Sequence, residues 1–367
     1  MKKKIRVGLL FGGRSGEHEV SVASATSVLK SLDPDKYEAV PIGITREGHW
    51  LIADSPEMLL EHEIIQGLPD TSEAMPDMTH RGIVRVDGRG AIDLHQTAVD
   101  VVFPLLHGTY GEDGTVQGLL ELADLPYVGA GVLGSAVSMD KAIMKSLFTQ
   151  AGLPIVADER VKLNQWYASR DEILYRIELS LEYPLFVKPC NLGSSVGISK
   201  AMDRQGLMQS LELAFRYDRK VIVEQGVVAR EVECSVLGND EPVVSVAGEV
   251  VSHHDWYDYE SKYTEGLADL KIPAQLSSEQ ARQVEKYARQ AFMAVDAAGL
   301  ARVDFFILKD DGRVIVNEIN TIPGFTQTSM YPKLWEASGL PYPDLIDRLI
   351  QLAFDRHAEK SYRSVNR

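Results

Sequence analysis

Short apolar runs alternate with amphipathic stretches through the first third of the chain. Residues 5–11, 37–45 and 99–106 are short and rich in apolar side chains, which is typical of buried strands. Residues 17–31 carry a helical pattern between the first two runs. Strands that alternate with helices predict a parallel sheet covered by helices. Residues 54–98 are polar and rich in Pro, Gly and Asp, and the pattern leaves their structure open.

A second part of the chain begins near residue 138. Ser138 is a candidate helix N-cap, and the pattern after it predicts a helix over 139–151 that ends before Gly152. The next elements that we expect are a strand, a glycine–serine loop, a helix and a strand, at 185–189, 191–197, 203–216 and 220–225. A third part follows with a strand, a long helix and a hairpin, at 230–238, 278–298 and 301–320.

The charge balance and hydropathy exclude some classes of protein. The formal net charge of -15 argues against general nucleic-acid binding, because neutralising phosphates requires an excess of Lys and Arg. It does not argue against a small anionic ligand, which a few local cations or backbone N–H groups can hold. No apolar run approaches the roughly 20 residues that span a bilayer. The N-terminal MKKKIRVGLLFGG is interrupted by glycines and charges, so it predicts a strand and not a signal peptide.

The two cysteines suggest a compartment. Cys190 and Cys234 lie far apart, with no spacing typical of a metal site. Two thiols in a chain of this size favour unpaired residues over a disulfide, and therefore the cytoplasm.

The hairpin at 301–320 carries charge on one face. Arg302 and Asp304 share a face of the first strand, and Glu318 and Asn320 share a face of the second, because side chains alternate along a strand. A two-residue turn would put the two sets on opposite faces. A three-residue loop at 310–312, with its glycine left-handed, pairs Asp304 with Glu318 and Arg302 with Asn320. We predict the three-residue loop.

This register predicts a metal site. Two carboxylates and an amide are oxygen ligands, which suit a hard cation such as magnesium. Strand Asp and Glu residues also occur on solvated hairpin faces, and the hairpin alone leaves both interpretations open.

Several other segments suggest phosphate binding. Lys188 interrupts the apolar strand 185–189, where a lysine requires an anionic partner. The loop after it lacks the Walker pattern, but its N–H groups could cover phosphates as well as form a simple turn. Glu224 ends another apolar strand, where the backbone could read an adenine edge while Glu224 or Glu231 binds ribose.

Three other positions have two interpretations each. Glu17 begins a helix, where it would cap the helix or hold a substrate ammonium. Lys141 and Lys145 lie one helical turn apart, and solvent exposure is the simplest expectation for both. FGGRSGEHE does not keep the G-x-G-x-x-G fingerprint, so a nicotinamide cofactor is disfavoured.

The order of these motifs resembles a known family. LFVKP, GSSVG, VIVEQ, REVE, ARVDFF and VNEINTIPGF resemble the ATP-grasp fold, in which two α+β lobes hold ATP between them. With GGRSGEHEVS, HGTYGEDGTVQG, VGAGVLGSAVSMDK and YDYESKY added, the chain resembles the D-alanine–D-alanine ligase family from residue 5 to about residue 353, apart from 54–98.

The resemblance implies three domains of α/β and α+β class. They would be an N-terminal doubly wound parallel-sheet domain at 1–137, a central lobe at 138–229 and a C-terminal lobe at 230–367. The polar and aromatic segment 252–266 would be a lid.

The resemblance also implies which residues bind ATP and which bind the metal ions. The phosphates of ATP would contact three lysines: Lys141, Lys188 and Lys262. Adenine and ribose would contact Glu224, Val227 and Glu231. The ligands of magnesium or manganese, usually two ions, would be Asp304, Glu318 and Asn320.

The substrates implied are two D-alanine molecules. Glu17 would bind the ammonium of the first, with Ser194 and Tyr263 joining it in a hydrogen-bonded set that closes the lid. His107 would lie beside this first substrate. The carboxylate of the second would be received by Ser329 and Lys262.

The chemistry implied is an acyl phosphate that the second amine attacks. Arg302 and the N–H of Gly324 would stabilise the oxyanion. The product would be D-alanyl-D-alanine for peptidoglycan, made by a cytoplasmic homodimer without nucleic-acid or membrane partners. Close alternatives are a D-alanyl-D-lactate ligase or a ligase of another dipeptide, although Tyr263 resembles the dipeptide-forming type. A nucleotide-binding regulator without catalysis is the alternative of a different class.

Overall fold

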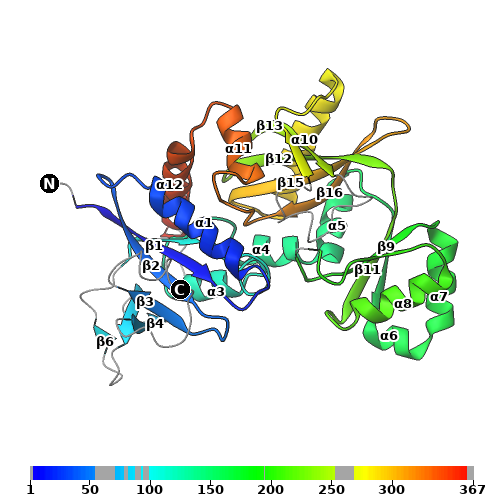
Figure 1. Cartoon of the computed structure of the whole chain (residues 1–367), viewed down its shortest axis with the longest axis horizontal. Helices are drawn as coiled ribbons and strands as arrows, with labels where there is room; N and C mark the ends of the chain where they lie inside the picture. Colours follow the sequence, from blue (N-terminus) through cyan, green and yellow to red (C-terminus); the bar gives the residue numbers. More distant parts are fainter. Residues whose placement is uncertain are drawn as a thin grey trace.

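The computed structural model describes residues 3–53, 71–77, 82–86, 92–93, 99–193, 195–252 and 268–361. Within these ranges the strands form three sheets. Figure 1 shows them as three bodies, with the N-terminal sheet at the left, the central sheet at the right and the C-terminal sheet between and above them. Among the helices of the described ranges, none is long and apolar enough to cross a membrane.

The N-terminal sheet is mixed. β1 (Ile5–Gly12) pairs in parallel with β2 (Tyr37–Ile44) and β7 (Val101–Pro104), as predicted. The sheet order is β6-β5-β4-β3-β2-β1-β7. The outer strands are antiparallel and are β3 (Trp50–Ala53), β4 (Thr71–Asp77), β5 (Gly82–Val86) and β6 (Ile92–Asp93).

The prediction of a wholly parallel sheet for this domain is therefore wrong for the strands that follow β2 on that side of the sheet. The chain turns back sharply after that strand, where Thr45 N–H donates to His49 O at 2.9 Å and Gly48 has φ +96°. A tight turn cannot carry the crossover that a parallel neighbour requires. The region without predicted elements supplies β4, β5 and β6.

Helices cover this sheet. α1 (His18–Ser31) begins one residue later than predicted, and the helices after β7 are α3 (Thr115–Leu122) and α4 (Val132–Met139). The side chain of Glu17 makes no capping hydrogen bond to α1. The capping interpretation of the Glu17 side chain is therefore wrong, and its substrate role stays a prediction.

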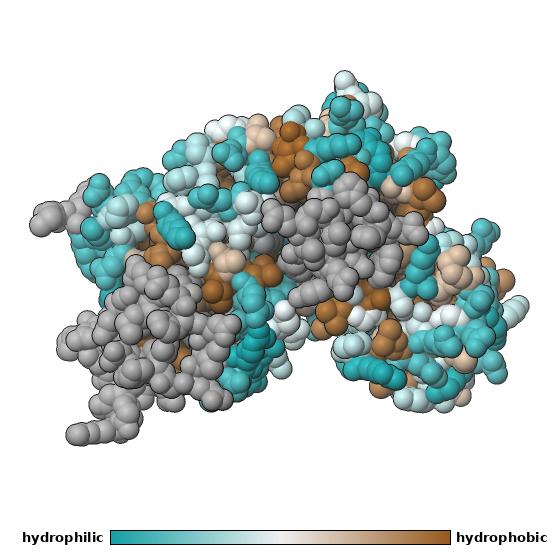
Figure 2. Space-filling view, viewed as in Figure 1, coloured by the Kyte–Doolittle hydropathy of each residue, from teal (hydrophilic) through white to brown (hydrophobic). Residues whose placement is uncertain are grey.

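The central sheet is antiparallel, in the order β10-β9-β11-β8. Its strands are β8 (Asp158–Lys162), β9 (Leu185–Pro189), β10 (Ser199–Ala201) and β11 (Lys220–Gln225). The helices that cover it are α6 (Leu163–Ala168), α7 (Arg170–Ser180) and α8 (Arg204–Ala214). Buried Ile173, Ile177 and Leu211 face the sheet. The outer surface of this lobe is mostly hydrophilic in Figure 2, as expected for amphipathic helices packed on one sheet face.

The C-terminal sheet has the order β14-β13-β12-β15-β16. Its strands are β12 (Ala229–Gly238), β13 (Val243–Ser252), β14 (Ala268–Lys271), β15 (Gly299–Leu308) and β16 (Val314–Asn320). Its helices are α10 (Ser278–Ala294) and α11 (Met330–Ala337). Neighbouring strands of this sheet are antiparallel throughout the described residues, and α10 connects β14 to β15.

Two helices pack outside the domain in which the sequence places them. α5 (Lys141–Gln150) contributes Met144 and Phe148 to the core under the C-terminal sheet. α12 (Tyr342–Ser361) contributes Ile346 and Leu349 to the core of the N-terminal sheet. These helices join the three bodies, while the domain limits themselves remain a prediction.

The N-cap of α5 differs from the prediction. Asp140 caps the helix, because its carboxylate accepts a hydrogen bond from the N–H of Ile143 at 3.1 Å. Ser138 lies inside α4 and is buried. The separate helix α4 ends directly before Asp140. The helical pattern of the sequence did not show where α4 ends and α5 begins.

Candidate active site

The β15–β16 hairpin has the predicted register at its functional end. Asp304 lies opposite Glu318, and Arg302 lies opposite Asn320. Their side chains therefore share one face of the C-terminal sheet.

The hairpin reaches this register by a different route from the one predicted. Leu308 N–H donates to Arg313 O at 3.0 Å, so the turn holds the four residues 309–312, with Gly312 at φ +75°. The three-residue loop is therefore wrong. Phe305 pairs with Val316 while Asp304 pairs with Glu318, which leaves one extra residue as a bulge on β16. The longer turn and the bulge each shift the pairing by one residue, and the two shifts cancel at the site.

Arg302 is held by two carboxylates. Its Nε and Nη2 donate to the two oxygens of Asp304, each at 2.7 Å, and Nε lies 3.0 Å from Glu233 Oε2 on β12. Burial opposes the charge on Arg302, but Asp304 and Glu233 outweigh it and keep its pKa well above its usual range. The residue predicted to stabilise an oxyanion is thus bonded to a predicted metal ligand, a coupling that the sequence did not indicate.

The predicted metal ligands form a set of oxygen donors. Asp304 and Glu318 are partly buried, with side-chain exposures of 13% and 28%. Asn320 Oδ1 accepts from Ile322 N–H at 3.0 Å, which fixes the amide beside the two carboxylates. Carboxylate and amide oxygens fit Mg²⁺ or Mn²⁺, which prefer such ligands.

A buried triad of charges lies in the central lobe. Glu224 Oε1 is 2.8 Å from Lys145 Nζ, and Glu224 Oε2 is 2.6 Å from Lys188 Nζ. Burial would raise the pKa of Glu224, but the two ammonium groups outweigh it and lower that pKa to about 2. The anionic partner predicted for Lys188 is therefore present. Lys145 was expected to be exposed to solvent. This expectation is wrong, because its side chain is only 1% exposed.

Lys141 connects the phosphate-binding candidates with the metal ligands. Its Nζ donates to Leu192 O at 2.9 Å, in the glycine–serine loop, and lies 3.8 Å from Glu318 Oε2. Like Lys145 it is not solvent-exposed, with a side-chain exposure of 12%. α5 therefore supplies two lysines to the space between the central and C-terminal sheets.

The adenine and ribose candidates lie around the junction of β11 and β12. Val227 packs against the buried side chains of Val156, Leu308 and Ile315. Glu231 lies on β12, close enough to Lys188 that its charge contributes to the raised pKa of that lysine.

His107 follows β7 and is buried. Its Nδ1 lies 2.9 Å from Ile322 O, and its Nε2 lies 3.1 Å from Ser24 Oγ. Burial lowers the pKa of His107, although the nearby Glu17 and the carbonyl of Ile322 oppose this shift. The neutral ring therefore joins the N-terminal domain to the segment after β16.

Glu17 has a second carboxylate beside it. A methyl group on Gly108 would lie 2.9 Å from Glu17 Oε2, and one on Gly193 would lie 3.6 Å from the same atom. Glu112 Oε2 accepts from Gly108 N–H at 2.6 Å. Burial, together with the charge of Glu17, raises the pKa of Glu112 to about 8. Glu112 lies in HGTYGEDG, and its neighbouring glycines were the signal that could have identified it.

Gly324 lies against Ser329. A methyl group on Gly324 would be 3.2 Å from Ser329 Oγ, which is tighter than nine in ten real contacts of this kind. Ser329 Oγ also accepts from Thr326 N–H at 3.1 Å. The absence of a side chain at Gly324 thus permits close packing next to the serine predicted to bind substrate.

Three predicted site residues, Ser194, Lys262 and Tyr263, lie outside the described residues, as does most of the segment 252–266. Their roles stay predictions.

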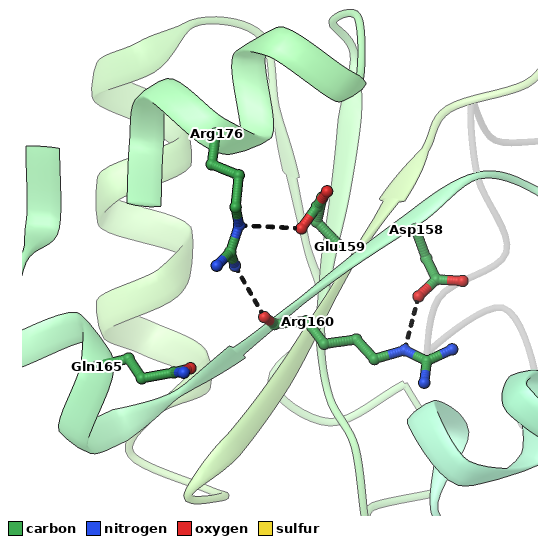
Figure 3. Close-up of a pocket in the computed structure, with 5 residues that line it drawn as sticks. All are labelled: Asp158, Glu159, Arg160, Gln165 and Arg176. Carbon is green, nitrogen blue, oxygen red and sulfur yellow. Dashed lines mark hydrogen bonds and ion pairs between the residues drawn. The ribbon is translucent and has the colours of Figure 1, made fainter. Parts of the chain in front are cut away.

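A separate open pocket of about 440 Å³ lies at the outer edge of the central sheet, on β8 and the helices beside it. Figure 3 shows its charged side chains turned toward one another. Arg176 Nε is 3.1 Å from Glu159, and Arg160 Nε donates to Asp158 at 2.9 Å. These cations are already paired with carboxylates, and the pocket contains none of the predicted site residues.

Two family models match the chain. One, described as the D-ala D-ala ligase C-terminus, matches residues 147–351, and another, described as the D-ala D-ala ligase N-terminus, matches residues 6–130. The first alone spans more than half of the 367 residues. The chain belongs to the D-alanine–D-alanine ligase family.

Similar proteins agree with this membership. A D-alanine–D-alanine ligase of Natranaerobius thermophilus is 47% identical over 364 residues, which are 99% of each chain. One of Geobacillus thermodenitrificans is 50% identical over 358 residues, 97% of each chain.

Solved structures of the family have the same fold. The D-alanine–D-alanine ligase from Coxiella burnetii superposes with a TM-score of 0.85 at 38% identity, covering 98% of this chain and 96% of that one. The VanG D-Ala:D-Ser ligase from Enterococcus faecalis gives a TM-score of 0.85 at 35% identity, covering 96% of this chain and all of that one. The predicted family and its ATP-grasp fold class are confirmed.

Proposed function

We propose that this protein joins two D-alanine molecules into D-alanyl-D-alanine at the expense of ATP, releasing ADP and phosphate. The position of Lys141 carries the proposal. Its ammonium contacts the glycine–serine loop at Leu192 O and lies 3.8 Å from Glu318. The candidate phosphate-binding loop, a cation and a candidate metal ligand therefore meet at one point, an arrangement that would suit phosphoryl transfer.

ATP would lie between the central and C-terminal lobes. Lys141 and Lys188 would contact its phosphates, together with Lys262. Both oxygens of Glu224 already bind lysines, so its strand would read adenine through the backbone near Val227. Glu231 would then bind the ribose.

Asp304, Glu318 and Asn320 would hold one or two ions of Mg²⁺ or Mn²⁺. When bound, the metal would offset negative charge on the phosphates. Arg302 stays beside these ligands and keeps Glu233 as a partner of its own.

The D-alanine sites would lie toward the N-terminal domain. Glu17 would bind the ammonium of the first D-alanine, close to Gly108 and Gly193, with Ser194 and Tyr263 completing the set. His107 would border that molecule. The second D-alanine would place its carboxylate on Ser329 and Lys262.

The reaction would have two steps. A carboxylate oxygen of the first D-alanine attacks the γ-phosphorus of ATP, and the bond to ADP breaks, which leaves an acyl phosphate. The amine of the second D-alanine attacks the acyl carbon, with Arg302 and the N–H of Gly324 stabilising the oxyanion. Phosphate then leaves, and the amine loses its proton.

D-Serine is the competing second substrate with support among the similar structures, because one of them is a D-Ala:D-Ser ligase. D-Lactate is the competitor suggested by family chemistry. We favour D-alanine because the curated relatives with 47% and 50% identity are named D-alanine–D-alanine ligases. Tyr263 resembles the dipeptide-forming type, which disfavours D-lactate but does not separate D-serine from D-alanine.

We further propose a cytoplasmic homodimer that supplies peptidoglycan precursors. Sedimentation of the purified protein tests the dimer, and fractionation of the producing cells tests the compartment.

Product analysis tests the activity. Purified protein is incubated with ATP, Mg²⁺ and D-alanine, alone or with equal D-serine or D-lactate, and the products are separated by mass. The proposal requires D-alanyl-D-alanine and ADP in equal amounts, with D-alanyl-D-alanine dominant in the mixtures. A mixed product in excess would show that the alternative acceptor is preferred.

A further inference from the structure

A chain of hydrogen bonds joins the N-terminal domain to residues 322–325, the segment that contains Gly324. His107 contacts Ile322 O through Nδ1, at 2.9 Å, and Ser24 Oγ through Nε2, at 3.1 Å. Ser24 Oγ also accepts from Phe325 N–H at 3.3 Å. The two side chains thus hold both ends of a four-residue segment that lies about 300 residues from α1 in the sequence.

The partners allow only one arrangement of protons. A backbone carbonyl can only accept, so Nδ1 of His107 carries the hydrogen that Ile322 O receives. In the neutral ring Nε2 is then an acceptor, and the Ser24 hydroxyl must donate to it. The oxygen of Ser24 remains free to accept from Phe325 N–H. Both side chains are buried, with exposures of 0% and 4%, so water is not available as a substitute partner.

The segment between these contacts has little freedom. Ile322 N–H donates to Asn320 Oδ1 at 3.0 Å, which fixes its start. Gly324 packs so closely on Ser329 that even a methyl group would lie 3.2 Å from Oγ. A shift of either end would therefore move the N–H of Gly324.

We propose that Ser24 is a positioning residue, which holds His107 in the Nδ1–H tautomer and with it clamps residues 322–325, so that the N–H of Gly324 points at the reacting carbonyl. The catalytic part of this inference rests on the proposed function. The clamp itself rests only on the contacts of Ser24 and His107.

Ser24→Ala tests the clamp, with Ser21→Ala as a matched control. Ser21 lies one turn earlier on α1, is equally buried and also makes two hydrogen bonds through its hydroxyl. Its partners are Gly12 N–H, at 2.7 Å, and Leu105 O, both outside residues 322–325. Both variants lose buried hydrogen bonds and therefore stability, but only Ser24→Ala releases the ring of His107.

The first measurement is the tautomer of His107 in ligand-free protein labelled with ¹⁵N-histidine, at about pH 8, where an ordinary imidazole is neutral. His107→Gln identifies the signal. We expect the Nδ1–H form in the unmodified protein and in Ser21→Ala, and a mixture or the Nε2–H form in Ser24→Ala. A proton on Nε2 in the unmodified protein would overturn the clamp, even if Ser24→Ala does not fold.

The second measurement separates kcat from KM. We expect kcat to fall about tenfold in Ser24→Ala, less than for outright loss of an oxyanion donor, with the KM for ATP unchanged. An unchanged kcat in Ser24→Ala, or an equal fall in Ser21→Ala, would overturn the positioning role. If the unmodified protein makes no D-alanyl-D-alanine, the proposed function fails by itself, and the tautomer still decides the clamp.

Discussion

Arg302 donates two hydrogen bonds of 2.7 Å to the carboxylate of Asp304, two positions along the same strand. The group expected to stabilise the oxyanion and a ligand expected to hold the metal therefore share one carboxylate. Glu233 lies 3.0 Å from Arg302 on the neighbouring strand. Glu233 would therefore remain a partner of the guanidinium if Asp304 bound a metal ion.

This sharing predicts that Arg302→Ala has opposite effects on metal binding and on turnover. Without the guanidinium, Asp304 keeps its full charge for a divalent cation, so Mn²⁺ should bind the ligand-free protein several times more tightly. Turnover should fall by about a hundredfold, because the oxyanion loses a donor. Calorimetric titration with Mn²⁺ and steady-state kinetics measure the two effects. Arg313→Ala, which removes an exposed cation from the turn of the same hairpin, should change neither.

Glu318→Ala should abolish turnover and leave the fold intact. Its side chain is only partly buried, and its loss leaves the cross-strand pairing of the backbone in place. Thermal unfolding and product formation measure the two consequences. The control is Asp311→Ala, which removes an exposed carboxylate from the same hairpin. Near-normal turnover in Glu318→Ala would show that the metal ligands are wrongly assigned.

The triad of Lys145, Glu224 and Lys188 predicts a charge-dependent affinity for ATP. Two ammonium groups share one carboxylate, so one positive charge remains for the phosphates. Lys145→Met removes this excess, and ATP should bind at least about tenfold more weakly, since a close charge pair in a protein interior is worth more than about 1.4 kcal/mol. Fluorescence or calorimetric titration with ATP measures it.

The double variant Lys145→Met with Glu224→Gln provides the control for that experiment. It removes the carboxylate that neutralises Lys188 most directly and so restores one positive charge to the triad. Affinity for ATP should then recover, at least in part. A double variant that binds as weakly as Lys145→Met would show that packing, and not charge, sets the affinity.

The raised pKa of Glu112 predicts how stability depends on pH. Burial and the charge of Glu17 raise this pKa to about 8 in the folded state, whereas an unfolded Glu titrates at about 4.3. The stability that the protonated form contributes is complete below about pH 4.3 and is lost as the pH rises toward 8. The free energy of unfolding should therefore decline over this range by at least about 1 kcal/mol more in the unmodified protein than in Glu112→Gln.

Urea unfolding at several pH values, without D-alanine, measures this difference. Asp113→Asn, a change in the next residue of the same motif, should keep the pH dependence of the unmodified protein. Parallel pH profiles for Glu112→Gln and the unmodified protein would mean that Glu112 is ionised throughout.

Much of the site could be predicted because its features are local. Alternation along a strand put Arg302 and Asp304 on one face, and an apolar strand around Lys188 predicted an anionic partner. Motif order identified the family over most of the chain. The hairpin shows where local reasoning stops: the pairing of Asp304 with Glu318 was right, but a four-residue turn and a bulge produce it.

The sequence by itself determined the family, the elements around the site and the chemical types of its residues, because these depend on neighbours along the chain. Only the tertiary structure decided which charges meet. Lys145, on α5, is buried because Glu224 of the distant strand β11 lies 2.8 Å away, and Ser24 of α1 contacts His107 after β7. Arg302 contacts Glu233 because β12 lies beside β15. Such contacts arise from the packing of distant segments, which no local pattern of polar and apolar residues specifies.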